Sequence, residues 1–243
     1  MKTALLLIDI QNDYFPGGRF EVVGASAASL AAAQLLAFFR ANAWPVVHVQ
    51  HLSVRPGAGF LLPGTTGAEI HASVAPLAAE PLIIKNHPDS FQAAGLEDCL
   101  QANAIERLVI AGMMTHMCIG TTVRAAFAKG YQCLVTQDAC ATRDLVFAGQ
   151  DVPAAACRRP SWRPGSSARP RSALGRAVFS GAAGGGRHGL ADDFDQALGV
   201  DRQRPVLAVG HVPGGVHGPV LEAAGLELAA GKHFARGEAR QEG

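Results

Sequence analysis

Short apolar runs alternate with helix-like stretches from the start of the chain to about residue 156. The runs that we predict as strands are 3–9, 45–52, 81–85, 106–112 and 131–139. They are nearly continuous in apolar residues, which is typical of strands that are buried on both faces. Alternation of such strands with helices predicts an α/β fold, in which helices cover both faces of a parallel sheet.

Helix-like composition fills the segments between these runs. We predict helices over 26–43, 91–104 and 119–130. Pro45 follows the first of them, and Gly130 stands where a glycine commonly ends a helix. In parallel α/β sheets, ligands and reacting groups gather at the carboxyl ends of the strands. Polar residues at those ends are therefore the first candidates for a functional site.

Composition divides the chain into a predicted domain, residues 1–157, and an atypical tail, residues 158–243. The tail has no Ile, Thr, Asn, Met or Tyr, and it holds 16 of the 28 glycines. The codons of Ile, Asn, Met and Tyr are poor in G and C. We therefore hypothesise a frameshift in a GC-rich gene near residues 157–158. The alternative is a natural, poorly ordered low-complexity extension.

Charge, hydropathy and cysteine usage argue against several classes of protein. A formal net charge of +1 lacks the basic excess of a nucleic-acid-binding domain. No apolar stretch reaches the ~20 residues of a membrane span, and Asp9 interrupts the first apolar run too early for a signal peptide. The five cysteines contain no CxxC pair, which indicates reduced thiols and a cytoplasmic protein.

Three chemically active side chains stand at or just beyond predicted strand ends: Asp9, Lys85 and Cys118. Each of them also has an ordinary structural explanation. An Asp at a strand end commonly forms a turn, a Lys there is commonly solvated, and a lone Cys is commonly a small buried apolar residue. An acid, an amine and a thiol that meet at one edge of a parallel sheet could instead carry out nucleophilic catalysis.

The segments around these residues resemble the isochorismatase-like cysteine hydrolases, which include nicotinamidases and related amidases. The matching segments are "LLLIDIQNDYF", "IIKNHPDSF" and "VIAGMMTHMCIGTTVRAAFAKGYQCLVTQDACATRD". The resemblance covers about residues 3–156 and implies a three-layer, Rossmann-like α/β fold. It also implies a catalytic triad of Asp9, Lys85 and Cys118, a small-molecule amide as substrate, no cofactor and a homo-oligomer.

The resemblance further implies a cis peptide between Met113 and Met114. We expect it to direct the N–H of Met114, beside that of Cys118, at one oxyanion position. The helix that begins near Cys118 and the charge of Lys85 predict a thiol that ionises readily. Asp9 would accept the thiol proton and later deliver it to the leaving group, while a thioester forms at Cys118.

Four further residues are candidates for the substrate pocket: Gln11, Phe15, Phe91 and Thr115. Each has an alternative structural role. Gln11 could cap a loop, the two phenylalanines could belong to the core, and Thr115 could support the turn before Cys118.

We expect no metal ion, because the Asp-x-His pattern of the nicotinamidases and its second histidine are missing. His48 and His51 are three positions apart on a strand, which sends them to opposite faces, and His71 lacks ligand partners. A metal-independent amidase is therefore favoured over a nicotinamidase. Cleavage of an enol ether, as in isochorismate, is a further alternative, although Cys118 favours amide hydrolysis.

Two other interpretations stay open. The match stops where "DVPAAA" (151–156) would begin the family's last helix. A replaced C-terminus could therefore leave a non-catalytic protein that acts only by association. Cys118 could also be a redox sensor that pairs with Cys140.

Overall fold

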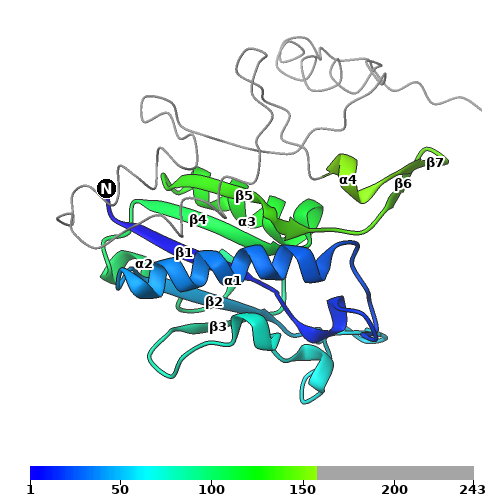
Figure 1. Ribbon diagram of the computed structural model, residues 1–243, viewed down its shortest axis with the longest axis horizontal. Helices are drawn as coiled ribbons and strands as arrows, with labels where there is room; N and C mark the ends of the chain where they lie inside the picture. The colour runs from blue at the N-terminus through cyan, green and yellow to red at the C-terminus, as the bar shows by residue number, and fades with distance from the viewer. Residues whose placement is uncertain (158–243) are drawn as a thin grey trace, which may run out of the picture. The chain divides into compact units, whose positions relative to one another are not determined.

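The computed structural model describes residues 1–157 (Figure 1). The tail that was predicted over 158–243, with its hypothetical frameshift, lies outside these residues. Within residues 1–157, no helix is long and apolar enough to cross a membrane.

The described chain contains a five-stranded sheet, a two-stranded hairpin and four α-helices. The strands are β1 Thr3–Ile8, β2 Val46–His51, β3 Leu82–Lys85, β4 Arg107–Met113, β5 Gln132–Ala141, β6 Leu145–Phe147 and β7 Gln150–Val152. The helices are α1 Ala25–Ala41, α2 Leu96–Ala102, α3 Gly120–Ala128 and α4 Ala154–Cys157. The five predicted strands are confirmed to within a few residues, as are the first and third predicted helices.

The five-stranded sheet is entirely parallel, with the strand order β3-β2-β1-β4-β5. From β1 the chain proceeds outward to β2 and β3, and from β4 it proceeds outward to β5 on the other side. The order therefore reverses between β1 and β4, which is where open α/β sheets place their ligands. The predicted α/β class with a parallel sheet is confirmed.

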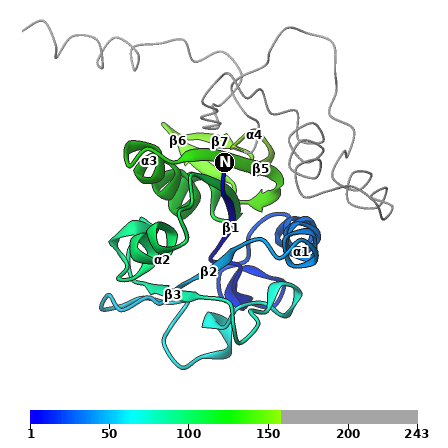
Figure 2. The same ribbon diagram turned by 90° about the vertical axis from the view of Figure 1, so that its left-hand side faces the viewer.

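Helices cover both faces of this sheet and make it the middle of three layers. Leu5 and Leu7 of β1 pack in the same cluster as α1. Leu6 and Ile8 point the other way, into the cluster that holds residues of α2 and α3. Figure 2 shows α1 on one side of the strands and α2 with α3 on the other. Every residue of β1 and β4 is buried, which explains why these strands, after Thr3 and Arg107 at their first positions, are continuously apolar rather than alternating.

The prediction of a helix over 91–104 is wrong for the first part of that range. Residues Ser90–Gln92 form a short 3₁₀ turn, and α2 begins only at Leu96. Gly95 precedes α2 with a φ of 89°, a left-handed conformation that interrupts the helical path.

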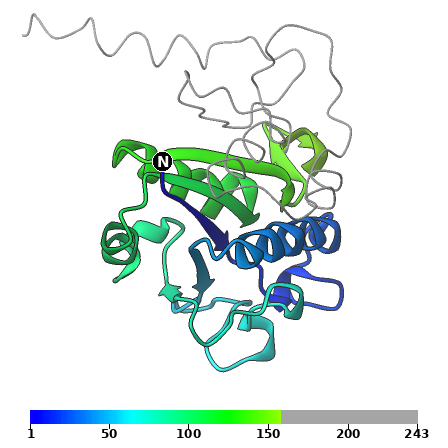
Figure 3. The same ribbon diagram turned by 60° about the vertical axis from the view of Figure 1, so that its left-hand side comes forward.

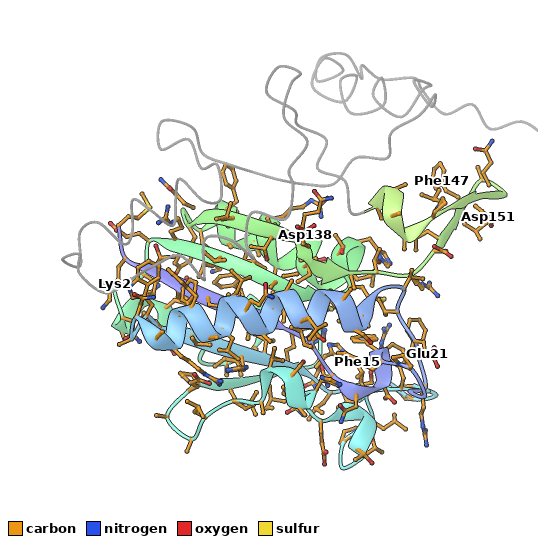
Figure 4. The ribbon with its side chains drawn as sticks, in the orientation of Figure 1. Lys2, Phe15, Glu21, Asp138, Phe147 and Asp151 are labelled. Atoms are coloured by element: carbon orange, nitrogen blue, oxygen red, sulfur yellow. The ribbon has the colours of Figure 1, made fainter. Side chains whose placement is uncertain are left out.

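The β6–β7 hairpin was not predicted. Its two turn residues, Ala148 and Gly149, have φ values of 49° and 76°, as a type I′ turn requires. Asn-Gly is the usual sequence signal for such a turn. This hairpin has alanine in place of the asparagine, so the signal is absent. The hairpin and α4, drawn in yellow-green in Figure 3, end the described chain. Phe147 and Asp151 mark the hairpin in Figure 4.

Candidate active site

The carboxyl edge of the sheet brings the three predicted catalytic side chains together. Asp9 follows β1, Lys85 ends β3, and Cys118 lies in a π-helical turn, Thr115–Ile119, between β4 and α3. Lys85 Nζ donates a hydrogen bond to Asp9 Oδ2 at 2.7 Å. The Cys118 sulfur lies within 4.8 Å of an Asp9 oxygen. All three side chains are buried.

Unusual backbone geometry surrounds this group. Asp9 has a φ of 54°, a left-handed conformation that Asp and Asn adopt more readily than most residues. Gly112 has a φ of 136°, and a Cβ there would lie 1.9 Å from the Ile8 carbonyl oxygen. Only glycine therefore lets β4 approach β1 so closely beside Asp9. The peptide between Met113 and Met114 is cis, as expected.

The ammonium group of Lys85 is fully engaged by its neighbours. It lies 2.7 Å from Asp9 Oδ2, 3.1 Å from His51 Nδ1 and 3.1 Å from the His87 carbonyl oxygen. Burial alone would lower the pKa of Lys85, but attraction to Asp9 and Cys118 raises it above its ordinary value. Lys85 therefore stays protonated and fixes one oxygen of Asp9.

The other oxygen of Asp9, Oδ1, is buried and has no conventional hydrogen-bond partner among residues 1–157. Burial raises the pKa of Asp9, and Lys85 opposes that rise. A buried carboxylate oxygen without a full partner is a strong proton acceptor. Because the Cys118 thiol interacts with this carboxylate, it is the nearest available proton source.

The expectation of a readily ionised thiol is wrong for the resting site. Burial, followed by the negative charge of Asp9, raises the pKa of the Cys118 thiol to about 12, despite the opposing charge of Lys85. Cys118 also lies inside the turn that precedes α3 rather than at the first residue of that helix. The resting group is therefore a thiol beside a carboxylate and an ammonium, and the thiol must lose its proton during attack.

His51 belongs to the same group, although the sequence did not identify it. Its ring lies against Lys85 and within 4.8 Å of the ligand atoms of Asp9 and Cys118. Its position at a strand end could have identified it as a site residue, since His51 ends β2 and pairs with Lys85 at the end of β3. His48 points to the other face and contacts Glu80 at 2.9 Å, which confirms that the two histidines separate.

Protonation of His51 should make the protein less stable as the pH falls. Burial and then the charge of Lys85 lower the pKa of His51 to about 4, whereas an unfolded histidine has a pKa near ~6.5. Between these two pH values the unfolded chain binds a proton that the folded protein does not. The contribution of His51 to the free energy of unfolding is therefore fully present above pH ~6.5 and is lost as the pH falls toward ~4.

Urea unfolding of the wild type at several pH values in this range should show that decline, and His51→Gln should show a smaller one. His87→Gln, which removes an exposed neighbouring histidine, serves as the control and should keep most of the wild-type slope, because the charge of His87 has the smallest of the effects on the pKa of His51. An unchanged slope in His51→Gln would refute the assignment.

A metal ion fits this group poorly. Asp9, His51 and Cys118 bring together atom types that transition metals bind. However, the Lys85 ammonium contacts both Asp9 and His51, so a cation there would have to displace an existing positive charge. Metal independence therefore stays a prediction.

The four predicted pocket residues have different surroundings. Gln11 is buried, and its amide bonds the backbone of His51 and Ala68, so it fastens the end of β2 to the 66–68 turn. Thr115 donates to the Ala141 carbonyl oxygen at 3.2 Å and ties the Cys118 turn to β5. Both residues act on the scaffold around the site.

The two predicted pocket phenylalanines lie in different places. Phe15, marked in Figure 4, is buried and stacks on the His71 ring at 3.6 Å between centroids. The structure does not bring Phe91 to the triad. Its ring contacts Tyr131 and Lys129, which connect the end of α3 to the start of β5, at the edge opposite to Cys118.

Tyr14 also lies near the triad, which the sequence did not predict. It is buried in the turn after Asp9, and burial together with the charges of Asp9 and Cys118 raises its pKa. Its ring contacts Phe20 and Phe60. The segment "QNDYF" contained this residue, but the contacts of a single tyrosine in a turn cannot be predicted from the sequence.

Known proteins resemble this chain in sequence and in fold. Residues 3–151 match the isochorismatase domain family. The isochorismatase family protein YddQ of Bacillus subtilis is 49% identical over 154 residues, which cover 63% of this chain and 86% of YddQ. Maleamate amidohydrolase of Pseudomonas putida is 31% identical over 151 residues, which cover 56% of this chain and 71% of the relative.

Solved structures agree with these matches. An isochorismatase from Pseudomonas putida KT2440 superposes with a TM-score of 0.60 at 33% identity, covering 64% of this chain and 79% of that one. The order of the strands, the position of the sheet-edge residues and the match over 3–151 all indicate the same family. This chain therefore belongs to the isochorismatase family, whose members are hydrolases and in many cases amidases.

Proposed function

We propose that this protein hydrolyses the C–N bond of a small-molecule amide through a thioester on Cys118. The observation that carries the proposal is the buried Asp9–Lys85–Cys118 group, in which Lys85 holds one oxygen of Asp9, and the other oxygen has no conventional hydrogen-bond partner within residues 1–157. Relatives named for amide or related hydrolysis, among them maleamate amidohydrolase, nicotinamidase 3 and streptothricin hydrolase, support this class of reaction.

The first half of the reaction uses Asp9 as base and then as acid. Asp9 accepts the thiol proton as the Cys118 sulfur bonds to the amide carbon, and the carbonyl electron pair moves onto oxygen. The tetrahedral intermediate then collapses. The C–N bond breaks, the nitrogen takes the proton from Asp9, and an acyl group stays on sulfur.

The second half regenerates the thiol. Water attacks the thioester carbon and gives a proton to Asp9, the carbon–sulfur bond breaks, and the sulfur recovers that proton. The product is the carboxylic acid. Because the resting thiol is protonated, each step moves one proton between Asp9 and a reacting atom, and Lys85 keeps the carboxylate in position.

Backbone N–H groups of Met114 and Cys118 are our candidates for the oxyanion donors. Met114 precedes the π-helical turn, and its carbonyl accepts from Met117 and Ile119, the N–H groups on either side of Cys118. N–H groups in the first turn of a helix lack intrahelical partners. Donors of this kind typically contribute about 10²–10³ in rate each.

The proposal predicts an acyl adduct on Cys118 during turnover. A panel of small primary amides is screened for ammonia release, and the fastest substrate is mixed with the protein and quenched in acid within milliseconds to seconds. Peptide mass spectrometry should show the acyl mass on the peptide that contains Cys118 and on no other cysteine peptide. Ammonia release in the burst phase without this adduct would exclude the thioester.

A further inference from the structure

Two buried hydroxyl groups join the loop after Lys85 to the helix after Cys118. Ser90 begins the 3₁₀ turn described above, and Thr122 is the third residue of α3. Both residues are 0% exposed. Their hydroxyl oxygens lie 2.9 Å apart, and the N–H of Ser90 also donates to Thr122 Oγ1 at 3.0 Å. We call this pair the hydroxyl clasp.

The hydrogen-bonding capacity of the Thr122 hydroxyl is fully used in the clasp. Its oxygen accepts the N–H of Ser90, and its proton is donated to the Pro88 carbonyl oxygen at 3.4 Å. The Ser90 hydroxyl then donates to the remaining lone pair of Thr122 Oγ1. Valine at position 122 would keep the shape of the side chain but leave two buried donors of Ser90 without an acceptor. Such a loss costs more than that of the bonds alone.

Pairing within the sheet holds Lys85 and Cys118 only indirectly. Lys85 ends β3 and Cys118 follows β4, while β2 and β1 lie between those strands. Neighbouring strands are about 4.8 Å apart, so three intervals separate β3 from β4 by roughly 14 Å. A small change of twist in each interval would add up over that span. A direct connection between the two segments removes this freedom.

The hydroxyl clasp provides that connection, because both of its ends lead to reacting groups. At one end, the loop that contains Ser90 also contains His87, whose carbonyl oxygen accepts from Lys85 Nζ at 3.1 Å. At the other end, Thr122 lies four residues after Cys118, which is about one helical turn. A shift of the loop relative to α3 would therefore move the ammonium relative to the thiol.

The spacing matters because Lys85 acts on the thiol electrostatically. Burial and then Asp9 raise the pKa of the Cys118 thiol, whereas the charge and the hydrogen bonding of Lys85 lower it. The attraction between two charges declines with distance, and it is larger in a buried site than in water. An ammonium group that moved away from the sulfur would therefore leave less thiolate for attack.

We propose that Ser90 and Thr122 are positioning residues, whose hydroxyl clasp holds the Lys85 ammonium at the distance from the Cys118 sulfur that the attack requires. The inference rests on the proposed attack by Cys118, but its first test needs no turnover. A clasp that only sealed the loop against α3 would have the opposite effect in that test.

Alkylation of Cys118 by iodoacetamide separates positioning from sealing. The rate at one fixed pH is measured by peptide mass spectrometry in the wild type, Thr122→Val and Thr122→Ser. Thr122→Val should react about 3- to 10-fold more slowly, because the thiolate loses part of its stabilisation by the ammonium. Thr122→Ser keeps the hydroxyl and should stay near the wild-type rate. If the clasp only sealed the site, Thr122→Val would admit the reagent and react faster.

Two further variants serve as controls for the alkylation rate. Ser90→Ala removes one hydroxyl but keeps the N–H bond to Thr122, so it should slow alkylation less than Thr122→Val does. Thr136 on β5 is also buried, and its hydroxyl donates to the Ile110 carbonyl oxygen at 3.0 Å. Thr136→Val removes a comparable hydrogen bond outside the clasp and should leave the rate within about twofold. An unchanged or faster rate in Thr122→Val, or an equal slowing in Thr136→Val, would overturn the proposal.

Turnover separates this inference from the proposed function. Thr122→Val should lower kcat for the fastest amide substrate by about 10- to 100-fold and leave KM within about threefold, because it misplaces reacting groups without touching the substrate. Thr122→Ser should restore kcat. A higher KM at unchanged kcat would contradict the proposal. If the wild type cleaves no amide but alkylation slows in Thr122→Val, positioning by the clasp stands and amide hydrolysis is the part that failed.

Discussion

Cys118→Ala should lower kcat/KM for the best amide by about 10⁴-fold or more, because removal of a nucleophile eliminates the covalent pathway. The substitution removes one sulfur from a buried site, so the free energy of unfolding should fall by no more than about 1–2 kcal/mol. Initial rates of ammonia release and urea unfolding measure the two effects separately.

Cys133→Ala is the matched control for this experiment. Cys133 is also buried, and burial alone raises its pKa to about 11. Among the described residues it has no acid or amine partner, and its thiol contacts the backbone carbonyls of Val123 and Tyr131. Its replacement should cost similar stability and leave kcat/KM within about threefold. Near wild-type activity in Cys118→Ala would mean that Asp9 activates water directly and that no thioester forms.

Lys85→Met should destabilise the fold by about 3–5 kcal/mol, the usual cost of leaving one charge of a buried pair without its partner. Both side chains of the Asp9–Lys85 pair are fully buried, and their charged atoms lie 2.7 Å apart. Asp9→Asn should also be destabilising, because it leaves the Lys85 ammonium without its counter-charge. Asparagine accepts the left-handed backbone at position 9, so backbone strain should add little.

The double variant Asp9→Asn/Lys85→Met should be more stable than either single variant, because it contains no unpaired buried charge. Urea unfolding at about pH 7.5 gives the four free energies of the cycle. Additive losses in the double variant would show that the two charges do not interact in the folded state. Activity should be lost in all three variants, whatever their stability.

Much of the sheet and of the triad was predictable from the sequence. The strands of this sheet are buried on both faces, so apolar runs bounded by helices were sufficient to locate them. Asp9, Lys85 and Cys118 were predictable because parallel strands end at one edge. The hairpin was not predictable, because Ala148 adopts a conformation that its side chain does not favour.

The properties of the site depend on burial and on contacts between distant residues. The sequence suggested an activating positive charge near Cys118, but it could not show that Asp9 cancels that charge or that the thiol is buried. His51 was overlooked because its role depends on the register between β2 and β3. Phe91 was a candidate for the substrate pocket, but its ring contacts Tyr131 at the start of β5, and the sequence does not reveal this long-range contact.

The pairing of β1 with β4 affects when the site can form during synthesis. Arg107 Nε bonds the hydroxyl of Thr3 across a separation of 104 residues. At the ribosomal rate of about 5–20 residues per second, β1 waits roughly 5–20 s for this partner. During that interval β1 can pair with β2, but one of its sides stays open. Asp9 and Lys85 therefore leave the ribosome before Cys118 does, and the reactive group cannot be completed until β4 and the turn that follows it have been synthesised.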